Sequence, residues 1–372
     1  MTRIVLIGPI EPFRGGIAHS STILANELAK ENDLLVLSFK RLYPTIFYPG
    51  KFQKAKGKPP ENIRTEFVLD SLNPLSWIKA VKKIKEFQAD AVVFEWWTTF
   101  LVPCYTFIIS KLKSETKSVI CQNVFPHKES KINKMLTKLF LKKADNLVAL
   151  SRSDEKTLES LKLKGKTARI IEPTYDSLIG LKKISKTEAR KKLKIKHKKV
   201  ILFFGFVREY KGLGFLINAM PTILKKHDAL LLIVGEFWES REKYERMIKE
   251  AGIEKNVLIE NRYIENNEIP LYFNASDVLV LPYTSSTESG IIQLAFGYGK
   301  PVITTKVGGN PDFIENEKNG FLVKPYNSKE LACAINKFYD KKLESAFVRE
   351  MNKKKKIFQW SKEKEKIVLG EF

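Results

Sequence analysis

Two cations stand close together in the second half of the chain, where an apolar run ends. Arg208 and Lys211 follow the run 200–205 (VILFFG), and Gly205 and Gly212 lie on either side of them. A guanidinium donates from a planar fork and an ammonium acts as a point charge, so the two together suit a diphosphate. A solvated basic loop has the same composition, and this segment alone leaves both interpretations open.

A glycine pair stands in a comparable place near the amino terminus. Gly15 and Gly16 come after the run 3–8 (RIVLIG) and before a helical pattern that starts at residue 18. Adjacent glycines let a backbone approach a ligand, and the first turn of a helix offers N–H groups to a phosphate. The spacing is not that of the G-x-G-x-x-G dinucleotide motif, and a tight turn between strand and helix explains it equally well.

A third loop is rich in hydroxyl groups. It runs over 282–293 (PYTSSTESGIIQ), after an apolar run that ends at residue 281. A helix that opens at 289–291 would turn its first backbone amides toward an anion, with the helix dipole assisting. Ser285 and Ser286 could instead be capping residues, an interpretation that accounts for the hydroxyls but not for Gly290.

Alternating strands and helices are predicted to hold these loops. The predicted strands are 3–8, 34–39, 91–94, 118–121, 146–150, 200–205, 229–234, 257–260, 278–281 and 301–304. The predicted helices are 18–32, 74–87, 130–143, 214–226, 240–251, 269–275, 291–298 and 328–339. Apolar runs without alternation are typical of parallel strands covered on both faces. We therefore predict an α/β chain with two Rossmann-like domains, 1–175 and 199–357, joined by a basic connector at 176–198, with the ligand in a deep interdomain cleft at the strand ends.

The second half of the chain resembles the C-terminal domain of glycosyltransferase family 4, whose members are retaining enzymes of the GT-B fold. The segments that carry the resemblance are 205–212 (GFVREYKG), 272–278 (YFNASDV), 289–295 (SGIIQLA), 299–305 (GKPVITT) and 307–311 (VGGNP). In the first half, the glycine pair matches the family's N-domain loop. The stretch 358–360 (FQW) is similar to the family's closing aromatic helix, which implies that 358–372 packs back on the N-terminal domain.

The resemblance also implies an activity and roles for individual residues. Arg208 and Lys211 would grip the diphosphate of a UDP- or GDP-sugar and stabilise its departure, without a metal or a further cofactor. The implied donor-binding residues are Gly15, Gly16, Glu288, Ser289, Gly290, Ile291 and Ile292. The implied enzyme is a retaining hexosyltransferase that acts on a glycan or polyprenyl-linked acceptor in cell-surface polysaccharide or glycolipid biosynthesis.

The sequence departs from the family in the third loop. Where the family commonly has two glutamates spaced E-x7-E, this chain has Ser286 and Leu294. The sugar and ribose contacts of those glutamates therefore do not carry over, and Glu288 is the residue expected to take part of the sugar-binding role. Arg208 also lies three residues before Lys211, where many members have the arginine five before. A GT-B scaffold protein with impaired donor binding remains an alternative.

The first half is expected to bind the acceptor. Its segment 122–127 (QNVFPH) resembles the family's active-site segment, which often begins with histidine; here Gln122 stands at that position and His127 follows five residues later. His127 is the catalytic candidate, with a packing or surface role as its alternative. The acceptor-side candidates are Arg14, Trp96, Trp97, Gln122 and Asn123. Tryptophan rings stack on sugars, although a Trp pair also suits a core.

The charge of the chain is unevenly distributed. The 372 residues carry 65 Lys and Arg against 42 Asp and Glu, and residues 1–200 hold 39 of the basic and 19 of the acidic side chains. Lysines recur in the first half at Lys51, Lys54, Lys56, Lys58, Lys131, Lys134, Lys138, Lys142 and Lys143, with apolar residues between them. Such a surface suits anionic lipid head groups, although a solvated lysine-rich face is the plainer alternative.

We therefore expect a cytoplasmic protein that is peripheral at the inner face of the cell membrane. Its three cysteines are far apart and predict neither a disulfide framework nor a zinc site, and no apolar run reaches the roughly 20 residues that span a bilayer. A nucleic-acid-binding protein is the less favoured alternative, because the second half is nearly neutral and contains no recognisable binding module.

Overall fold

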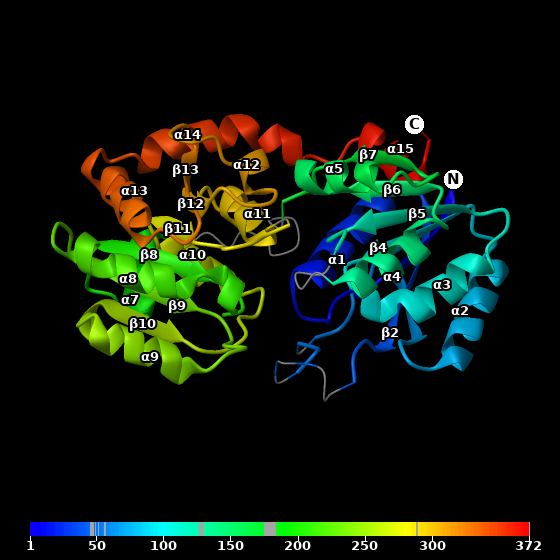
Figure 1. Cartoon of the computed structure of the whole chain (residues 1–372), viewed down its shortest axis with the longest axis horizontal. Helices are drawn as coiled ribbons and strands as arrows, with labels where there is room; N and C mark the ends of the chain where they lie inside the picture. Colours follow the sequence, from blue (N-terminus) through cyan, green and yellow to red (C-terminus); the bar gives the residue numbers. More distant parts are fainter. Residues whose placement is uncertain are drawn as a thin grey trace. The chain divides into compact units, whose positions relative to one another are not determined.

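The computed structural model describes residues 1–44, 48, 50, 52–55, 57–125, 130–174, 184–287 and 289–371. The chain divides into two compact units. The first comprises Met1–Pro173 together with Phe358–Phe372, and the second comprises Thr174–Ile357. Each unit is built on its own parallel sheet (Figure 1). Among the described residues, no helix combines the length and the apolar character that crossing a membrane requires.

The first unit contains seven parallel strands in the order β3-β2-β1-β4-β5-β6-β7. The strands are β1 (Arg3–Ile7), β2 (Asp33–Arg41), β3 (Arg64–Asp70), β4 (Ala91–Trp96), β5 (Thr116–Cys121), β6 (Asn146–Ala149) and β7 (Lys166–Arg169). The chain order reverses beside β1, which pairs with β2 on one side and with β4 on the other. In open parallel sheets such a reversal opens a space for ligands at the carboxyl ends of the strands.

Helices cover both faces of this sheet. They are α1 (Gly16–Leu28), α2 (Pro74–Glu86), α3 (Val102–Ser110), α4 (Lys131–Leu141), α5 (Arg152–Ser160) and α15 (Lys362–Leu369), with a 3₁₀ turn η2 (Thr99–Leu101). Alternate residues of β1 serve the two faces, because successive side chains of a strand point in opposite directions. Ile4 and Leu6 pack with α1 and α15, whereas Val5 and Ile7 pack with α2, α3 and α4. The last helix of the chain is thus part of the first unit.

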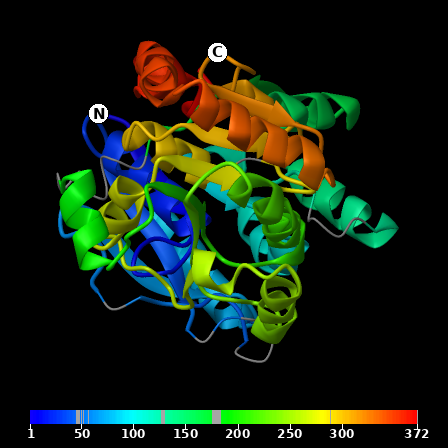
Figure 2. The same ribbon diagram turned by 90° about the vertical axis from the view of Figure 1, so that its left-hand side faces the viewer.

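The second unit contains six parallel strands in the order β10-β9-β8-β11-β12-β13. The strands are β8 (Lys199–Phe204), β9 (Ala229–Val234), β10 (Val257–Glu260), β11 (Val278–Leu281), β12 (Val302–Thr305) and β13 (Gly320–Val323). The helices are α7 (Lys186–Lys192), α8 (Leu213–Leu224), α9 (Arg241–Glu250), α10 (Ile269–Ala275), α11 (Gly290–Gly297), α12 (Asn310–Phe313), α13 (Ser328–Asp340) and α14 (Glu344–Lys354). Short 3₁₀ turns are η3 (Glu209–Lys211), η4 (Glu254–Asn256) and η5 (Lys355–Phe358). Figure 2 shows α8, α9 and α13 along one side of this sheet, and α7 and α10 on the other.

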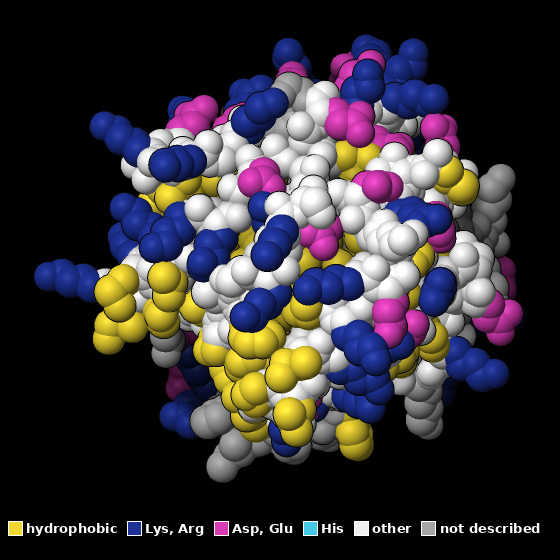
Figure 3. All heavy atoms as spheres, turned by 90° about the vertical axis from the view of Figure 1, so that its right-hand side faces the viewer, with side chains coloured by type: hydrophobic (Ala, Val, Ile, Leu, Met, Phe, Trp, Pro, Cys, Tyr) yellow, Lys and Arg dark blue, Asp and Glu magenta, His cyan; other side chains and the backbone are white. Residues whose placement is uncertain are grey.

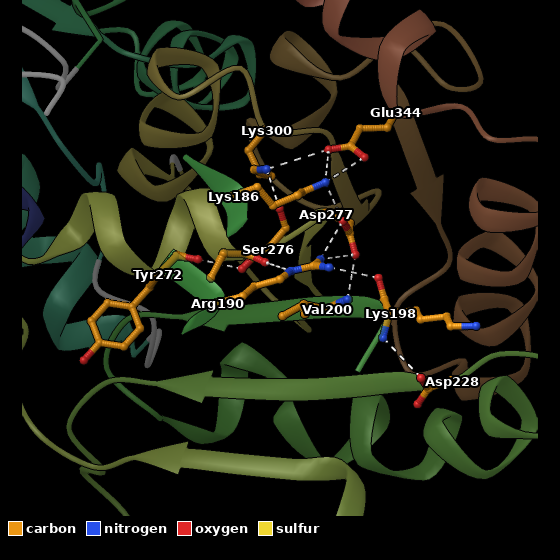
Figure 4. Close-up of polar contacts among 11 residues, drawn as sticks. Lys186, Arg190, Lys198, Val200, Asp228, Tyr272, Ser276, Asp277, Lys300 and Glu344 are labelled. Carbon is orange, nitrogen blue, oxygen red and sulfur yellow. Dashed lines mark hydrogen bonds and ion pairs between the residues drawn. The ribbon is translucent and has the colours of Figure 1, made fainter. Parts of the chain in front are cut away.

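Part of the predicted basic connector is helical and belongs to the second unit. Helix α7 begins at Lys186 behind the capping hydroxyl of Ser185, which accepts the N–H of Glu188. Arg190 of α7 forms two hydrogen bonds with the carboxylate of Asp277, at 2.9 and 3.0 Å (Figure 4). The same carboxylate accepts the N–H of Val200 at 2.6 Å. This network fixes α7 to the amino ends of β8 and β11, the edge opposite to the predicted ligand loops.

Candidate functional site

The loop after β8 brings Arg208 and Lys211 to the carboxyl edge of the second sheet. The chain leaves the strand through Gly205 with φ 107°, and the short turn η3 ends at Gly212 with φ 70°. A Cβ atom on Gly212 would lie 2.0 Å from the carbonyl oxygen of Pro282, so only glycine allows the backbone this close to the next loop. The two cations are therefore held against the loop that follows β11.

Backbone hydrogen bonds join three loops at this edge. The N–H of Thr284, in the loop between β11 and α11, donates to the carbonyl of Tyr210 at 2.7 Å. The N–H of Gly309, which follows β12, donates to the carbonyl of Thr287 at 2.6 Å. Loops that are far apart in the sequence thus form one rigid surface around Lys211.

The side chain of Lys211 points toward the start of α11. Its ammonium donates to the hydroxyl of Tyr283 at 3.2 Å, and that hydroxyl lies 3.4 Å from the hydroxyl of Ser289. Burial lowers the pKa of Lys211, and the neighbouring Arg208 lowers it further. A bound anion would relieve both effects, because it restores a counter-charge to a poorly solvated cation.

Arg208 is exposed and rests on aromatic rings. Its guanidinium carbon lies 5.3 Å from the ring centroids of both Tyr210 and Trp238. Phe206 stacks on Trp238 with centroids 4.3 Å apart. Stacking engages the face of a guanidinium, so the N–H groups on its edge keep their directions for an anionic ligand.

The predicted amide donors lie beside these cations. Ser289 is the N-cap of α11 and is buried, and Gly290 is the first residue of that helix. The Cδ1 atom of Ile291 lies 3.7 Å from the position a Cβ would take on Gly205, whereas Ile292 is buried in the helix. The second sheet therefore gathers two cations and a helix N-terminus at one edge, an arrangement that suits a phosphate or diphosphate.

The glycine pair of the first unit opens α1 at the corresponding edge of the first sheet. Gly15 is the N-cap with φ 108°, and Gly16 is the exposed first residue of the helix. Arg14 is anchored just before them, because its N–H donates to the carbonyl of Gln53 at 2.9 Å. Its guanidinium lies 5.7 Å from the ring of Phe52.

A buried polar network lies behind this loop. The side-chain amide of Gln122, just after β5, donates to Ser20 at 2.5 Å, to Glu95 at 3.1 Å and to Glu172 at 3.2 Å. The Ser20 hydroxyl in turn donates to Glu172. Burial, together with repulsion from Glu172, raises the pKa of Glu95 to about 8, and burial also raises the pKa of Glu172. The pair therefore retains a proton at neutral pH.

Comparison with known proteins follows the same division of the chain. Residues 185–357 match the family described as glycosyl transferases group 1. The match covers nearly all of the second unit and identifies that unit as similar to the group 1 glycosyltransferases. The chain is 29% identical to spore coat protein SA of Bacillus subtilis over 161 residues, 41% of the chain and 42% of that protein. The chain matches only 35 to 51% of the length of the first curated relatives.

The fold of the chain is GT-B, as solved structures show over almost its whole length. The Anabaena protein Alr3699/HepE, solved in complex with UDP-glucose, is 18% identical with a TM-score of 0.76, covering 99% of this chain and 98% of that one. WaaG, a glycosyltransferase involved in lipopolysaccharide biosynthesis, is 17% identical with a TM-score of 0.71, covering 99% and 100%. The predicted fold class is thereby confirmed, and the family match over residues 185–357 confirms the resemblance predicted from the sequence.

One sequence-based acceptor candidate, Trp96, lies in the core of the first unit. Trp96 is completely buried, its indole N–H donates to the carbonyl of Val124 at 3.2 Å, and its ring lies 4.9 Å from that of Phe140. A side chain packed in this way has no surface left for a sugar. Trp97 is buried as well, and its indole N–H donates to the hydroxyl of Tyr43 at 2.7 Å.

The remaining candidates are divided between described and undescribed parts of the chain. Gln122 and Asn123 follow β5, and Gln122 takes part in the buried network. His127 and Glu288 lie outside the described residues, as do Lys51 and Lys56 of the predicted basic loop.

Sequence reasoning missed Glu95, Glu172 and His19. The signal for Glu95 was available, because a carboxylate inside the apolar run 91–97 (AVVFEWW) is unusual in a covered strand. His19 lies on α1, 3.9 Å from Glu11, and burial lowers its pKa to about 4. This histidine is therefore neutral at pH 7.

Replacing Glu95 by glutamine is expected to stabilise the protein at high pH only. In the folded chain this carboxyl keeps its proton up to a pKa of about 8, whereas in the unfolded chain it loses it near 4.5. The free energy of unfolding thus falls by about 3–5 kcal/mol as pH rises between these values. Because glutamine does not titrate, the variant does not lose this stability. Unfolding midpoints should be equal near pH 4.5 and should favour the variant at pH 8.5. The raised pKa of Glu95 would be contradicted if the difference in midpoint between the variant and the unchanged protein did not change with pH. It would also be contradicted if the exposed control Glu61→Gln gave the same difference.

Proposed function

We propose that the protein is a retaining glycosyltransferase that moves a sugar from a nucleotide-sugar to a glycan or lipid-linked acceptor. The proposal rests on one observation: Arg208 and Lys211 lie together beside Ser289, the N-cap residue of α11. Two cations and a helix N-terminus match the charge and the oxygen geometry of a diphosphate. The UDP-glucose complex of the structurally similar Alr3699/HepE supports a nucleotide-sugar as donor.

The same residues suggest how the transfer proceeds. The bond between the anomeric carbon and the donor phosphate oxygen breaks, and its electron pair leaves with the nucleoside diphosphate. The acceptor hydroxyl adds to the same face of the sugar, and its proton passes to the departing diphosphate oxygen. Arg208 and Lys211 stabilise the negative charge that grows on the departing diphosphate, so the proposed reaction uses neither a metal ion nor another cofactor.

We place the acceptor in cell-surface polysaccharide or glycolipid biosynthesis, and the protein in the cytoplasm at the inner membrane face. Two observations support this placement. The first 200 residues carry twice as many basic as acidic side chains, 39 against 19. The structurally similar WaaG is involved in lipopolysaccharide biosynthesis.

A screen of donors tests the proposal. UDP-, GDP- and ADP-sugars are added to the full chain, and the unfolding temperature and the binding heat are measured. A ligand at about 100 times its Kd stabilises by about 2.7 kcal/mol, which shifts the midpoint of a domain of this size by roughly 5–10 °C. We expect such a shift with a UDP- or GDP-sugar and not with the free sugar. No binding of any nucleotide-sugar would favour the scaffold alternative.

A further inference from the structure

Exposed apolar side chains gather on two helices of the first unit. Leu75 and Ile78 of α2 expose 74% and 54% of their surface, and Ile132 and Met135 of α4 expose 65% and 64%. With the neighbouring exposed residues they form what we call the α2–α4 surface, defined as Leu72, Leu75, Ile78, Ile132, Met135 and Leu139. Exposed residues of this size usually occur singly, so five on two helices, with Leu72 just before α2, need an explanation.

These side chains are not needed to hold the helices to the sheet. Helix α4 buries Phe140 and Leu141 on its inner side, while Ile132, Met135 and Leu139 recur at helical spacing on its outer side. Helix α2 likewise buries Ala80, Val81 and Ile84 against the sheet. Both helices pack against α3, so their outer sides belong to the same face of the unit.

Lysines surround the apolar residues. The stretch 131–143 (KINKMLTKLFLKK) contains five lysines and no acidic residue. Lys79 and Lys82 of α2 and Lys111 after α3 are also exposed. Figure 3 views this side of the molecule and shows hydrophobic side chains gathered in its lower left part, with Lys and Arg side chains around them.

We propose that the α2–α4 surface docks the protein on a lipid bilayer that carries anionic head groups. Its apolar side chains enter the boundary between head groups and acyl chains, and its lysines contact the lipid phosphates. The lysines of this surface would repel a second copy of this basic chain and attract anionic lipids, so the charge favours a lipid surface as the partner. The inference deepens the proposed peripheral location and needs no glycosyl transfer, so its test contains no nucleotide-sugar.

Vesicle sedimentation with the full chain tests the proposal. We expect at least about tenfold stronger binding to phosphatidylcholine vesicles with phosphatidylglycerol than to pure phosphatidylcholine, at low salt. The double variants Leu75→Ser/Ile78→Ser and Ile132→Ser/Met135→Ser should each weaken binding to the anionic vesicles about tenfold. The matched control replaces exposed apolar residues of the second unit, Leu258→Ser/Tyr326→Ser, and should bind like the unchanged protein.

Two double lysine variants test the contribution of charge to membrane binding. Lys138→Gln/Lys142→Gln should weaken anionic binding and reduce its salt dependence, whereas Lys255→Gln/Lys329→Gln in the second unit should have little effect. Equal effects of the two lysine pairs would overturn the proposal, because they would indicate attraction by total charge alone.

Three further results would overturn it: equal binding to neutral and anionic vesicles, unchanged binding of both apolar variants, or a dimer in solution that Ile132→Ser/Met135→Ser converts to monomer. A measurement that leaves the α2–α4 surface unaltered uses Trp77, which lies on α2. Brominated phosphatidylglycerol should quench tryptophan fluorescence in the unchanged protein and much less in Trp77→Phe. Absence of quenching would also contradict docking through this surface.

Discussion

Replacing Lys211 by alanine is expected to weaken nucleotide-sugar binding by about ten- to hundredfold and to lower kcat/KM by about 10²–10³-fold. The ammonium lies 3.2 Å from the hydroxyl of Tyr283, and that hydroxyl lies 3.4 Å from the hydroxyl of Ser289, the N-cap of α11, where a diphosphate would meet the helix N-terminus. Its effect on kcat/KM exceeds its effect on binding, because the charge on the diphosphate grows as the sugar leaves. Calorimetry with the best donor of the screen and steady-state kinetics measure the two effects.

Matched variants separate the charge from the packing. Lys211→Arg keeps a cation and should recover part of the affinity, and Tyr283→Phe removes only the hydroxyl that the ammonium contacts. Lys255→Ala removes an exposed lysine of the same unit and should leave donor binding unchanged. If Lys211→Ala bound the donor as tightly as the unchanged protein, the assignment of the diphosphate site would be wrong.

The pH dependence of donor binding gives a second readout for Lys211. Burial and Arg208 lower the pKa of this lysine in the unliganded protein, and only its protonated form attracts the diphosphate. Donor affinity should therefore decrease as pH rises through that lowered pKa, below the range where an ordinary lysine titrates. Lys211→Arg should show no such decrease, since a guanidinium stays protonated.

The central strands were predictable because each is a continuous apolar run. Strands β1, β4, β8 and β9 are covered on both faces, which imposes such runs on the sequence. The strands β3, β7 and β13 were missed, and all three lie at edges of their sheets. The sequences of β3 and β7, RTEFVLD and KTAR, are largely polar because one side meets solvent, and β13 has only four residues. Periodicity is a weak signal for a short edge strand.

The sequence was sufficient to predict which loops form the candidate site, but not which side chains contact one another within it. Arg208, Lys211 and Ser289 all follow the ends of strands, and adjacent parallel strands bring their ends to one edge. The hydrogen bond between Lys211 and Tyr283, which lie 72 residues apart, depends on how their two loops pack, and local spacing does not determine that packing. Trp96 illustrates the same limit, because an aromatic residue at a strand end suits a core and a groove equally until its neighbours are known.

The largest expected loss of stability follows from replacing Asp277 by alanine. This carboxylate is buried and contacts Arg190 at 2.9 Å, Lys186 at 2.6 Å and the N–H of Val200 at 2.6 Å (Figure 4). Its removal leaves a largely buried guanidinium without its carboxylate partner and a strand N–H without its acceptor. Breaking one partner of a buried ion pair costs about 3–5 kcal/mol, so we expect the unfolding midpoint of the second unit to fall by roughly 10 °C.

A comparison with Asp228 tests whether this loss comes from the network. Asp228 accepts the backbone N–H of Lys198 at 3.2 Å and is exposed at the same edge of the second sheet. Asp228→Ala should therefore lower the free energy of unfolding by less than about 1 kcal/mol. Asp277→Asn keeps an acceptor for Val200 but loses the charge, and should fall between the two. Calorimetric scans of the three variants give the ranking, and an Asp277→Ala midpoint no lower than that of Asp228→Ala would show that α7 is held by packing rather than by its ion pairs.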